Sequence, residues 1–390
     1  MKTVETNLSP EKNLWQRLSV KFDIRAYTMI FALIAIWIIF TILTEGTYLT
    51  PRNLSNLSRQ MSITSVLAIG MVMVIVTTWI DLSVGSVLGL AGAVAAVLQV
   101  WYHVPTVWAI MAALGVGIIL GVWHGYWVAY QGVPAFIVTL AGMWAYRGMI
   151  MGMLKGITVA PMWPDFKVIS SGYLGVIPGA TLTTVAIIAL IIGRFRARQS
   201  RIKYGFKVSP LFLDLPVTAF YCALIVLATY VLYQYEGIPY PIIVVLVLVL
   251  IFTFLTRNTQ FGRQVYAMGG NAEAARLSGI NIKKRTMVVF VLCGLLASIA
   301  GVLTTARLNA ATITAGTGAE LDAIASCVIG GTSFMGGVGS IPGAILGALV
   351  MASIDNGLSM MNTESFWQYI IKGFVLLLAV WMDIKTKTRK

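Results

Sequence analysis

Long apolar runs recur along this chain, and they limit the folds that it can adopt more than any other feature. Twelve runs of 12 to 21 residues follow one another between short polar segments. A helix needs about 20 predominantly apolar residues to cross a bilayer. The chain is 58% hydrophobic and 11% charged over 390 residues, which is more apolar surface than a soluble core of this length would bury. Lipid is therefore the expected solvent, and unbroken runs favour helices over a barrel.

We predict an all-α, polytopic helical integral membrane protein with about twelve apolar segments, of which ten to twelve span the membrane. The segments are Tyr27–Leu43, Met61–Ile80, Val84–Val100, Val107–Trp127, Ala135–Met153, Thr181–Ile192, Val217–Leu232, Ile238–Leu255, Met287–Thr305, Leu321–Ser333, Ile341–Leu358 and Phe366–Trp381. Thr181–Ile192 and Leu321–Ser333 are short, so each is either a span extended by polar residues or a broken or re-entrant element.

The basic residues are distributed unevenly between the two sides of such a protein. If the N-terminus is cytoplasmic and every run crosses, 21 of the 28 Lys and Arg residues lie on the cytoplasmic side. Because basic loops tend to stay in the cytoplasm, we predict an even number of spans in a bacterial inner (plasma) membrane, with both termini cytoplasmic. Residues 1–26 then form a cytoplasmic segment, 27–381 the transmembrane domain and 382–390 a cytoplasmic tail. Within the domain, 193–216 is a basic cytoplasmic connector and 256–286 a second cytoplasmic segment.

The composition and the motif content exclude several classes of function. A net charge of +14 would favour nucleic acid in a soluble protein, but here the basic residues cluster between apolar runs, so we predict no nucleic-acid partner. Cys222, Cys293 and Cys327 lack metal-ligand spacing. The nucleotide-binding, zinc-protease and serine-hydrolase motifs are missing. We predict no catalytic residue, no metal site and no enzyme activity.

Two short patterns indicate an internal repeat. Val84–Gly89 opens one apolar run and Val338–Gly343 opens another, and in the twelve-span arrangement both lead from inside to outside. We therefore predict two related halves in parallel orientation, an arrangement that occurs in transporters. Gly117, Gly121 and Gly125 recur at helical spacing, which predicts close helix packing because glycine carries no Cβ atom.

Ionisable residues in or beside apolar runs are the first candidates for function, because a charge is costly in lipid. Asp81, Ser83 and Gly85 lie between two runs and are candidates for the solute path or its gate. The competing interpretation is that Asp81 and Ser83 cap the next helix at the cytoplasmic boundary. Glu320 and Asp322 are also candidates for the path or gate, although carboxylates at a helix start equally suit the positive end of its dipole.

One polar segment has the pattern of a single short helix. Asn271 is a good N-cap, 272–277 forms helix readily and Gly279 is a good stop. Such a helix is shorter than the roughly 12–15 residues that a helix needs in water, so something must pack against it. It is either a surface turn packed on its own protein or a docking helix for a cytoplasmic subunit. In the second case the contact residues are Asn271, Glu273, Arg276, Ser278 and Gly279.

Several stretches together resemble the sugar permeases of binding-protein-dependent ABC importers, the family of ribose, xylose, arabinose and galactose permeases. In chain order they are Ile80–Ser86, Gly269–Asn281, Glu320–Ala325 and Val328–Ser333. The resemblance covers nearly the whole chain. Any one of these stretches alone would be weak evidence for the family, but their combination is specific to it.

Within that family, the chain most resembles the D-xylose permeases. The similarity is greatest at Met351–Met361 and Phe366–Ile370. Compared with the shorter ribose-type permeases, the chain carries extra length from about Gly172 to Glu236, and the D-xylose permeases resemble it there too.

The resemblance implies an ABC importer permease fold in which two copies of the chain form the translocation path. Two cytoplasmic ATPase subunits would dock on the coupling segment around Asn271 to Gly279. A periplasmic or extracellular sugar-binding protein would deliver the substrate, for which D-xylose is the first choice. ATP would be used by the partner ATPase, so the chain itself would need no cofactor.

Other functions stay open at this point. The chain resembles permeases for ribose, arabinose and galactose as well. A secondary carrier would work without an ATPase, but it would require a buried proton relay for which the sequence offers only Asp81. A membrane-embedded enzyme would require an acidic or nucleophilic cluster at a membrane face.

Overall fold

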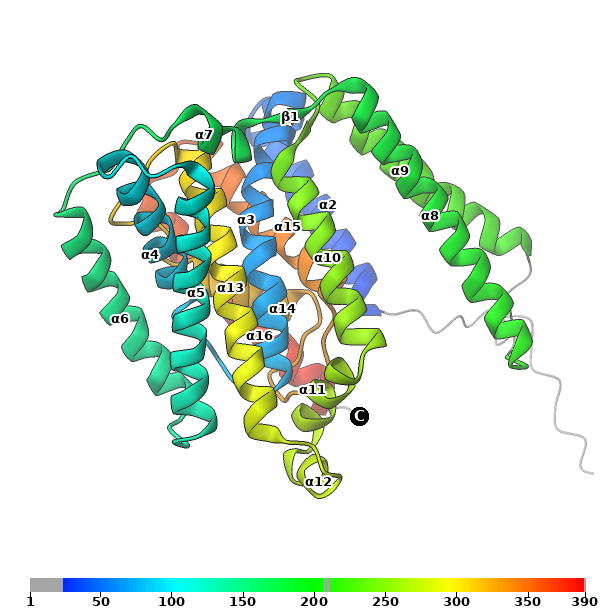
Figure 1. The fold of residues 1–390 in the computed structure, drawn as a ribbon. Helices are drawn as coiled ribbons and strands as arrows, with labels where there is room; N and C mark the ends of the chain where they lie inside the picture. The colour runs from blue at the N-terminus through cyan, green and yellow to red at the C-terminus, as the bar shows by residue number, and fades with distance from the viewer. Residues whose placement is uncertain (1–23, 207, 209–210, 389–390) are drawn as a thin grey trace, which may run out of the picture.

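The described part of the chain is almost entirely helical, and most of its helices stand side by side in one bundle (Figure 1). This computed structural model describes residues 24–206, 208 and 211–388. Most of the predicted N-terminal segment 1–26 and the end of the predicted tail lie outside the described residues. The α-helices of the first half are α2 (Ile24–Leu43), α3 (Pro51–Val76), α4 (Val84–Ala96), α5 (Thr106–Ala129), α6 (Ala135–Leu154), α7 (Pro164–Ser171) and α8 (Val176–Lys203). Those of the second half are α9 (Leu211–Tyr233), α10 (Tyr240–Asn258), α11 (Gln260–Gly270), α12 (Ala272–Leu277), α13 (Ile282–Leu308), α14 (Ala319–Ile329), α15 (Ile341–Met360) and α16 (Ser365–Thr388). The smaller elements are η1 (Thr47–Leu49), η2 (Val97–Trp101), β1 (Tyr173–Leu174) and β2 (Ile238–Pro239).

The membrane-protein prediction is confirmed. Ten helices among the described residues are long and apolar enough to cross a membrane, and α2 adds a shorter apolar stretch, Met29–Leu43. The short run Thr181–Ile192 becomes a helix of 28 residues, α8, that continues through a basic end. Arg, Lys and Gln form helices well although they are not apolar, so this helix extends beyond the end of its apolar run.

Two of the crossings are only partly helical. α14 has 11 residues, or about 16 Å at 1.5 Å per residue, which is half of a bilayer core. It is preceded by the non-helical linker 309–318, which follows α13. In the same way, the non-helical linker 77–83 joins the end of α3 to the start of α4. The run Leu321–Ser333 is therefore the second part of a broken crossing, one of the two possibilities left open by its length.

Contacts at the two ends of the bundle define the chain direction. At the end that carries α12, the backbone N–H of Gly337, just before α15, donates to the carbonyl of Val76 at the end of α3 (2.9 Å). At the opposite end, Asn53 and Asn356 exchange amide hydrogen bonds (2.8 and 3.1 Å). α3 and α15 are thus antiparallel. Among the described residues, the ten long apolar helices, α2, and α14 with its linker make twelve candidate crossings.

The centre of the bundle is formed by α3 and α13, whose inner residues are buried. α13 packs along α5 at three glycines: Gly117 lies against Gly294, Gly121 against Phe290 and Gly125 against Met287. At each of these positions a Cβ atom would come too close to the neighbouring helix. The predicted close packing at these glycines is confirmed.

The predicted parallel repeat of two halves remains a prediction. α3 and α13 are antiparallel neighbours, because Gly70 in the second half of α3 lies against Cys293 in the first half of α13, whereas Arg59 in the first half of α3 interacts electrostatically with Arg307 near the end of α13. Each is followed by a linker and a helix that begins within the bundle. The segments α3–α4 and α13–α14 thus share one feature, a helix followed by a linker and a second helix, with α3 and α13 running in opposite directions. The two Val-Gly-Ser patterns that we compared lie at the starts of α4 and α15.

α8 and α9 form a hairpin that leans away from the bundle (Figure 1). At its base, β1 and β2 pair antiparallel with Tyr173 opposite Pro239 and Leu174 opposite Ile238. Most side chains of both helices are exposed, as is expected for a helix pair surrounded by lipid. This hairpin coincides with the extra length that the sequence places at about 172–236.

Candidate functional site

The first turns of α4 and α14 meet inside the bundle, and we refer to Gly85, Gly316 and Glu320 as the junction. A Cβ atom on Gly85 would clash with the carbonyl oxygen of Gly316, and a Cβ atom on Gly316 would clash with that of Gly85. Gly316 has a φ of +73°, in the region that favours glycine. The two broken crossings therefore touch through bare backbone.

Glu320 lies in the first turn of α14 and reaches the first turn of α4. Its Oε2 atom is a close neighbour of Gly85 and is buried with no hydrogen-bond partner among the described residues. The positive ends of both helix dipoles favour a carboxylate here. Arg147 on α6 interacts electrostatically with Glu320, and its Nη1 donates to the carbonyl of Ala315 (2.7 Å). Gly85 and Glu320, two predicted candidates from distant parts of the chain, thus lie together.

Asp322 belongs to a second charged group that joins α14, α15 and α16. The Nζ atom of Lys372 lies 2.9 Å from Asp322 Oδ2 and 2.8 Å from Asp355 Oδ1. The three side chains are 13 to 21% exposed. One ammonium group between two carboxylates fastens α16, whose outer face is largely exposed, to the broken crossing.

Asp81 and Ser83 form a turn in front of α4. Asp81 Oδ1 accepts hydrogen bonds from the backbone N–H (2.8 Å) and the hydroxyl (2.6 Å) of Ser83. Both residues are buried. The capping interpretation is not supported, because Ser83 is the N-cap residue of α4 and its side chain accepts no hydrogen bond from a backbone N–H of that helix. The turn also lies within the bundle rather than at its end, because Leu88 on α4 packs against Gly301 on α13.

A buried pair from α5 and α6 lies near that turn. The hydroxyl of Tyr146 is 2.8 Å from His124 Nε2, and both side chains are at most 3% exposed. Each interacts electrostatically with Asp81. His124 is therefore packed inside the bundle.

The coupling segment stands at the end of the bundle, where α12 projects furthest (Figure 1). The predicted short helix is confirmed as Ala272–Leu277, and the Asn271 side chain accepts from the backbone N–H of Ala274 (2.9 Å). Glu273 and Arg276 form an exposed ion pair (2.6 Å), which lowers the pKa of the Glu273 carboxyl below its usual value. Gly279 has a φ of +84° and ends the helix.

Ser278 donates its hydroxyl to the carbonyl of Ala274 (2.9 Å) and so closes the last turn of α12. Leu277 is 77% exposed, an apolar side chain at the tip of a polar segment. This combination of a capped helix, an exposed ion pair and an exposed leucine suits a docking contact with another protein. The docking role of the five coupling residues remains a prediction.

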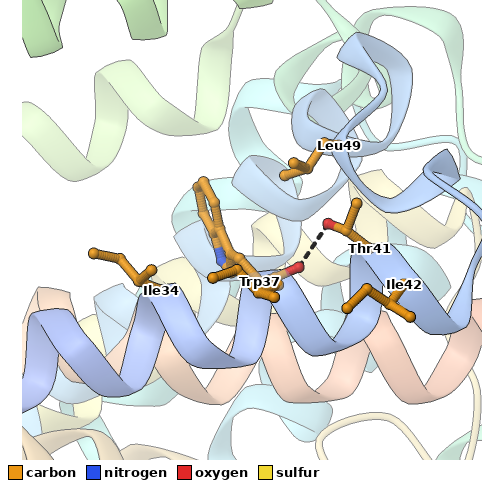
Figure 2. A pocket seen from close by; sticks show the side chains of 6 residues that line it. Ile34, Trp37, Thr41, Ile42 and Leu49 are labelled. Atoms are coloured by element: carbon orange, nitrogen blue, oxygen red, sulfur yellow. Dashed lines mark hydrogen bonds between the residues drawn. The ribbon is translucent and has the colours of Figure 1, made fainter.

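Two hollows on the surface suit a polar solute less well than the junction does, because both are lined mostly by apolar side chains. One, of about 300 Å³, lies on α2 against Leu49 and is lined by apolar side chains and Thr41 (Figure 2). The hydroxyl of Thr41 already donates to the carbonyl of Trp37 (2.6 Å). A second, of about 580 Å³, lies between α5 and α6 and is mostly apolar as well.

The sequence left three partners of the candidates unrecognised: Arg147, Asp355 and Lys372. Each carries a charge within a helix that spans the bundle, and charges in such places are usually paired. That rule shows that Lys372 needs a carboxylate but not which one, because Asp322 and Asp355 come from different helices.

Comparison with known proteins gives a consistent result. The family model described as "Branched-chain amino acid transport system / permease component" matches residues 53–380. The chain is 48% identical to the xylose transport system permease protein XylH of Haemophilus influenzae over 367 residues, 94% of this chain and 98% of that protein. It is likewise 48% identical to XylH of Escherichia coli over 368 residues, 94% of this chain and 93% of that protein.

Ribose permeases are more distant relatives. The ribose import permease protein RbsC of Escherichia coli is 37% identical over 356 residues, 91% of this chain and 93% of that protein. No solved structure matches the chain significantly.

Proposed function

The chain belongs to the family of branched-chain amino acid transport system permease components, and on this premise we propose that it is the transmembrane permease subunit of an ABC importer for D-xylose. The observation that carries the proposal is the 48% identity to xylose permeases over 94% of the chain. The more distant ribose permeases, at 37%, support a sugar rather than an amino acid as the substrate class.

The architecture supports a conduit. Broken crossings whose ends meet within a bundle are a recurring feature of transporters, because such ends supply backbone groups and dipoles to a polar solute. The junction places Gly85 and Glu320 at such a point. We propose that these residues, together with Asp322, Asp81 and Ser83, line or gate the path.

The proposed assembly contains three kinds of component. Two copies of this chain form the path, two ATPase subunits bind at α12, and a binding protein delivers the sugar at the opposite end. Twelve crossings and the bias of basic residues support a bacterial plasma-membrane protein with both termini on the cytoplasmic side, where α12 also lies. ATP is bound and hydrolysed by the partner subunits, and the proposal assigns no catalytic step or cofactor to this chain.

Uptake of labelled D-xylose into proteoliposomes tests the proposal. They contain the chain with its ATPase, with ATP inside and the sugar-binding protein outside in the orientation of import. Uptake that requires both ATP and the binding protein is the expected result. Uptake of ribose with its own binding protein, but not of xylose, would keep the mechanism and replace the substrate. Uptake that persists without ATP would favour a secondary carrier.

A further inference from the structure

Three chain segments meet backbone to backbone at the α12 end of the bundle, and we refer to Val76, Gly269 and Gly337 as the joint. Val76 is the last residue of α3, Gly269 is near the end of α11, and Gly337 lies in the loop 330–340 between α14 and α15. The Gly337 N–H donates to the carbonyl of Val76 at 2.9 Å. Each of the three segments thus contacts the others without an intervening side chain.

The joint has no room for a side chain on α11. A Cβ atom on Gly269 would clash with the carbonyl oxygen of Val76 and would lie 2.8 Å from the backbone nitrogen of Gly337. Gly337 itself has a φ of +68°, which glycine adopts without strain. Contacts between backbones deform less than contacts through flexible side chains. A displacement of α11 is therefore transmitted to the other two segments.

A side-chain hydrogen bond reinforces the joint one turn earlier on α11. The hydroxyl of Tyr266 donates to the carbonyl of Gly339 (2.9 Å). Burial raises the pKa of the Tyr266 phenol, so the hydroxyl keeps its proton at neutral pH and remains a donor. Tyr266 and Gly269 hold the same helix against the same loop.

The chain connections on either side of the joint lead to the coupling segment and to the junction. α12 follows α11 after Asn271 alone. From Val76 the linker 77–83 leads to α4, and from Gly337 the loop 330–340 leads back to α14. α4 and α14 are the two helices that meet at the junction, where Gly85 lies against Glu320 of α14 and against Gly316 in the linker before it.

We propose that the joint is the mechanical connection through which movement of the ATPase at α12 reaches both broken crossings at once, with Tyr266 and Gly269 as the positioning residues. The inference rests on the proposed function in that it requires an ATPase at α12, and it does not depend on which sugar is carried. α11 acts as a short lever, and because the end of α3 and the loop 330–340 both rest on it, the two halves of the junction move together.

Two variants interrupt the joint to different degrees. Tyr266→Phe removes one hydrogen bond and keeps the ring, so we expect a roughly two- to tenfold fall in sugar transported per ATP, the size expected for one hydrogen bond. Gly269→Ala forces the backbones apart and is expected to have a larger effect. Matched controls are Gly270→Ala, whose Cβ atom would meet nothing within 4 Å, and Tyr233→Phe, which removes a similar hydrogen bond to the carbonyl of Gly175 (2.9 Å) at the base of the hairpin.

Hydrogen exchange gives a readout that requires no sugar. In the complex of chain and ATPase in nanodiscs, ATP is expected to change exchange in α12, in the linker 77–83 and in the loop 330–340. In Tyr266→Phe and Gly269→Ala the change in α12 should persist, while the changes in the linker and the loop shrink. Both control variants should behave as the unmodified chain does.

Two results would overturn the proposal. One is an ATP-dependent change in the linker and the loop that is as large in Tyr266→Phe and Gly269→Ala as in the unmodified chain. The other is an unmodified complex in which ATP leaves the linker and the loop unchanged. If the unmodified chain shows the full exchange pattern but takes up no D-xylose, the joint is supported and the proposed sugar is wrong.

Discussion

Two sets of charges inside the bundle place a cation near a carboxylate. Lys372 serves two carboxylates, Asp322 and Asp355, and Arg147 interacts with Glu320. Removing one member of a buried set is costly because its partner then lacks compensation in a medium of low dielectric constant. These residues are therefore structural supports of the broken crossing whatever else they do.

Replacing Lys372 by Met tests whether this ion set supports the structure of the broken crossing. The two carboxylates that remain would repel each other, and we expect the free energy of unfolding to fall by on the order of 3 kcal/mol, measured by unfolding in mixed micelles. Adding Asp322→Asn and Asp355→Asn should restore most of the loss. Lys167→Met, at an exposed position on α7, is the matched control. If Lys372→Met and Lys167→Met have equal stability, the ion set is not a structural support.

Replacing Gly85 by Ala tests the junction. The added methyl group would clash with Gly316 and with Glu320, and overpacking of this kind typically costs about 1–3 kcal/mol. Transport should fall together with the unfolding temperature. Gly115→Ala on α5, where a Cβ atom would meet nothing within 4 Å, should leave both unchanged. A fully active and stable Gly85→Ala chain would show that the close approach of the two helices is dispensable.

Among the elements, those with one long apolar run were predicted and those that depend on distant contacts were not. Long apolar runs predicted α5, α6, α13, α15 and α16, because each of these helices needs only its own composition to be recognised. The start of α14 at Ala319 depends on the junction, and its partner Gly85 lies elsewhere in the chain. The short helix α12 was predicted because its cap and its stop are local.

The coupling segment offers an element-scale test. Replacing Glu273 and Arg276 by Ala together should leave the unfolding temperature unchanged, because both side chains are exposed and touch little else. Binding of the ATPase, measured by co-purification, and uptake should both fall. The swapped chain with Glu273→Arg and Arg276→Glu keeps the ion pair but reverses its direction, so it separates loss of the pair from loss of a specific contact. Normal binding and uptake in the double-alanine chain would contradict the docking role.

In the whole molecule, the hairpin is the part most nearly independent of the rest. Its two crossings enter and leave at the β1–β2 pair, so removing residues 176–236 with a short turn in their place removes an even number of crossings. We expect this shortened chain to insert with both termini still on one side, as read by labelling of single terminal cysteines, and to retain uptake. A shortened chain that inserts correctly but fails to assemble would show that α8 and α9 contact another subunit.

The brevity of α14 has a consequence for how the protein is made. During synthesis, a segment of 11 residues is too short to be released into lipid as an independent span. Its first turn rests on Gly85, which left the ribosome more than two hundred residues earlier. The first turn of α4 therefore stays without its packing partner in the membrane until the C-terminal part of the chain has been inserted. The nascent protein passes through an intermediate in which the N-terminal half is inserted but its contact surface for α14 is still uncovered.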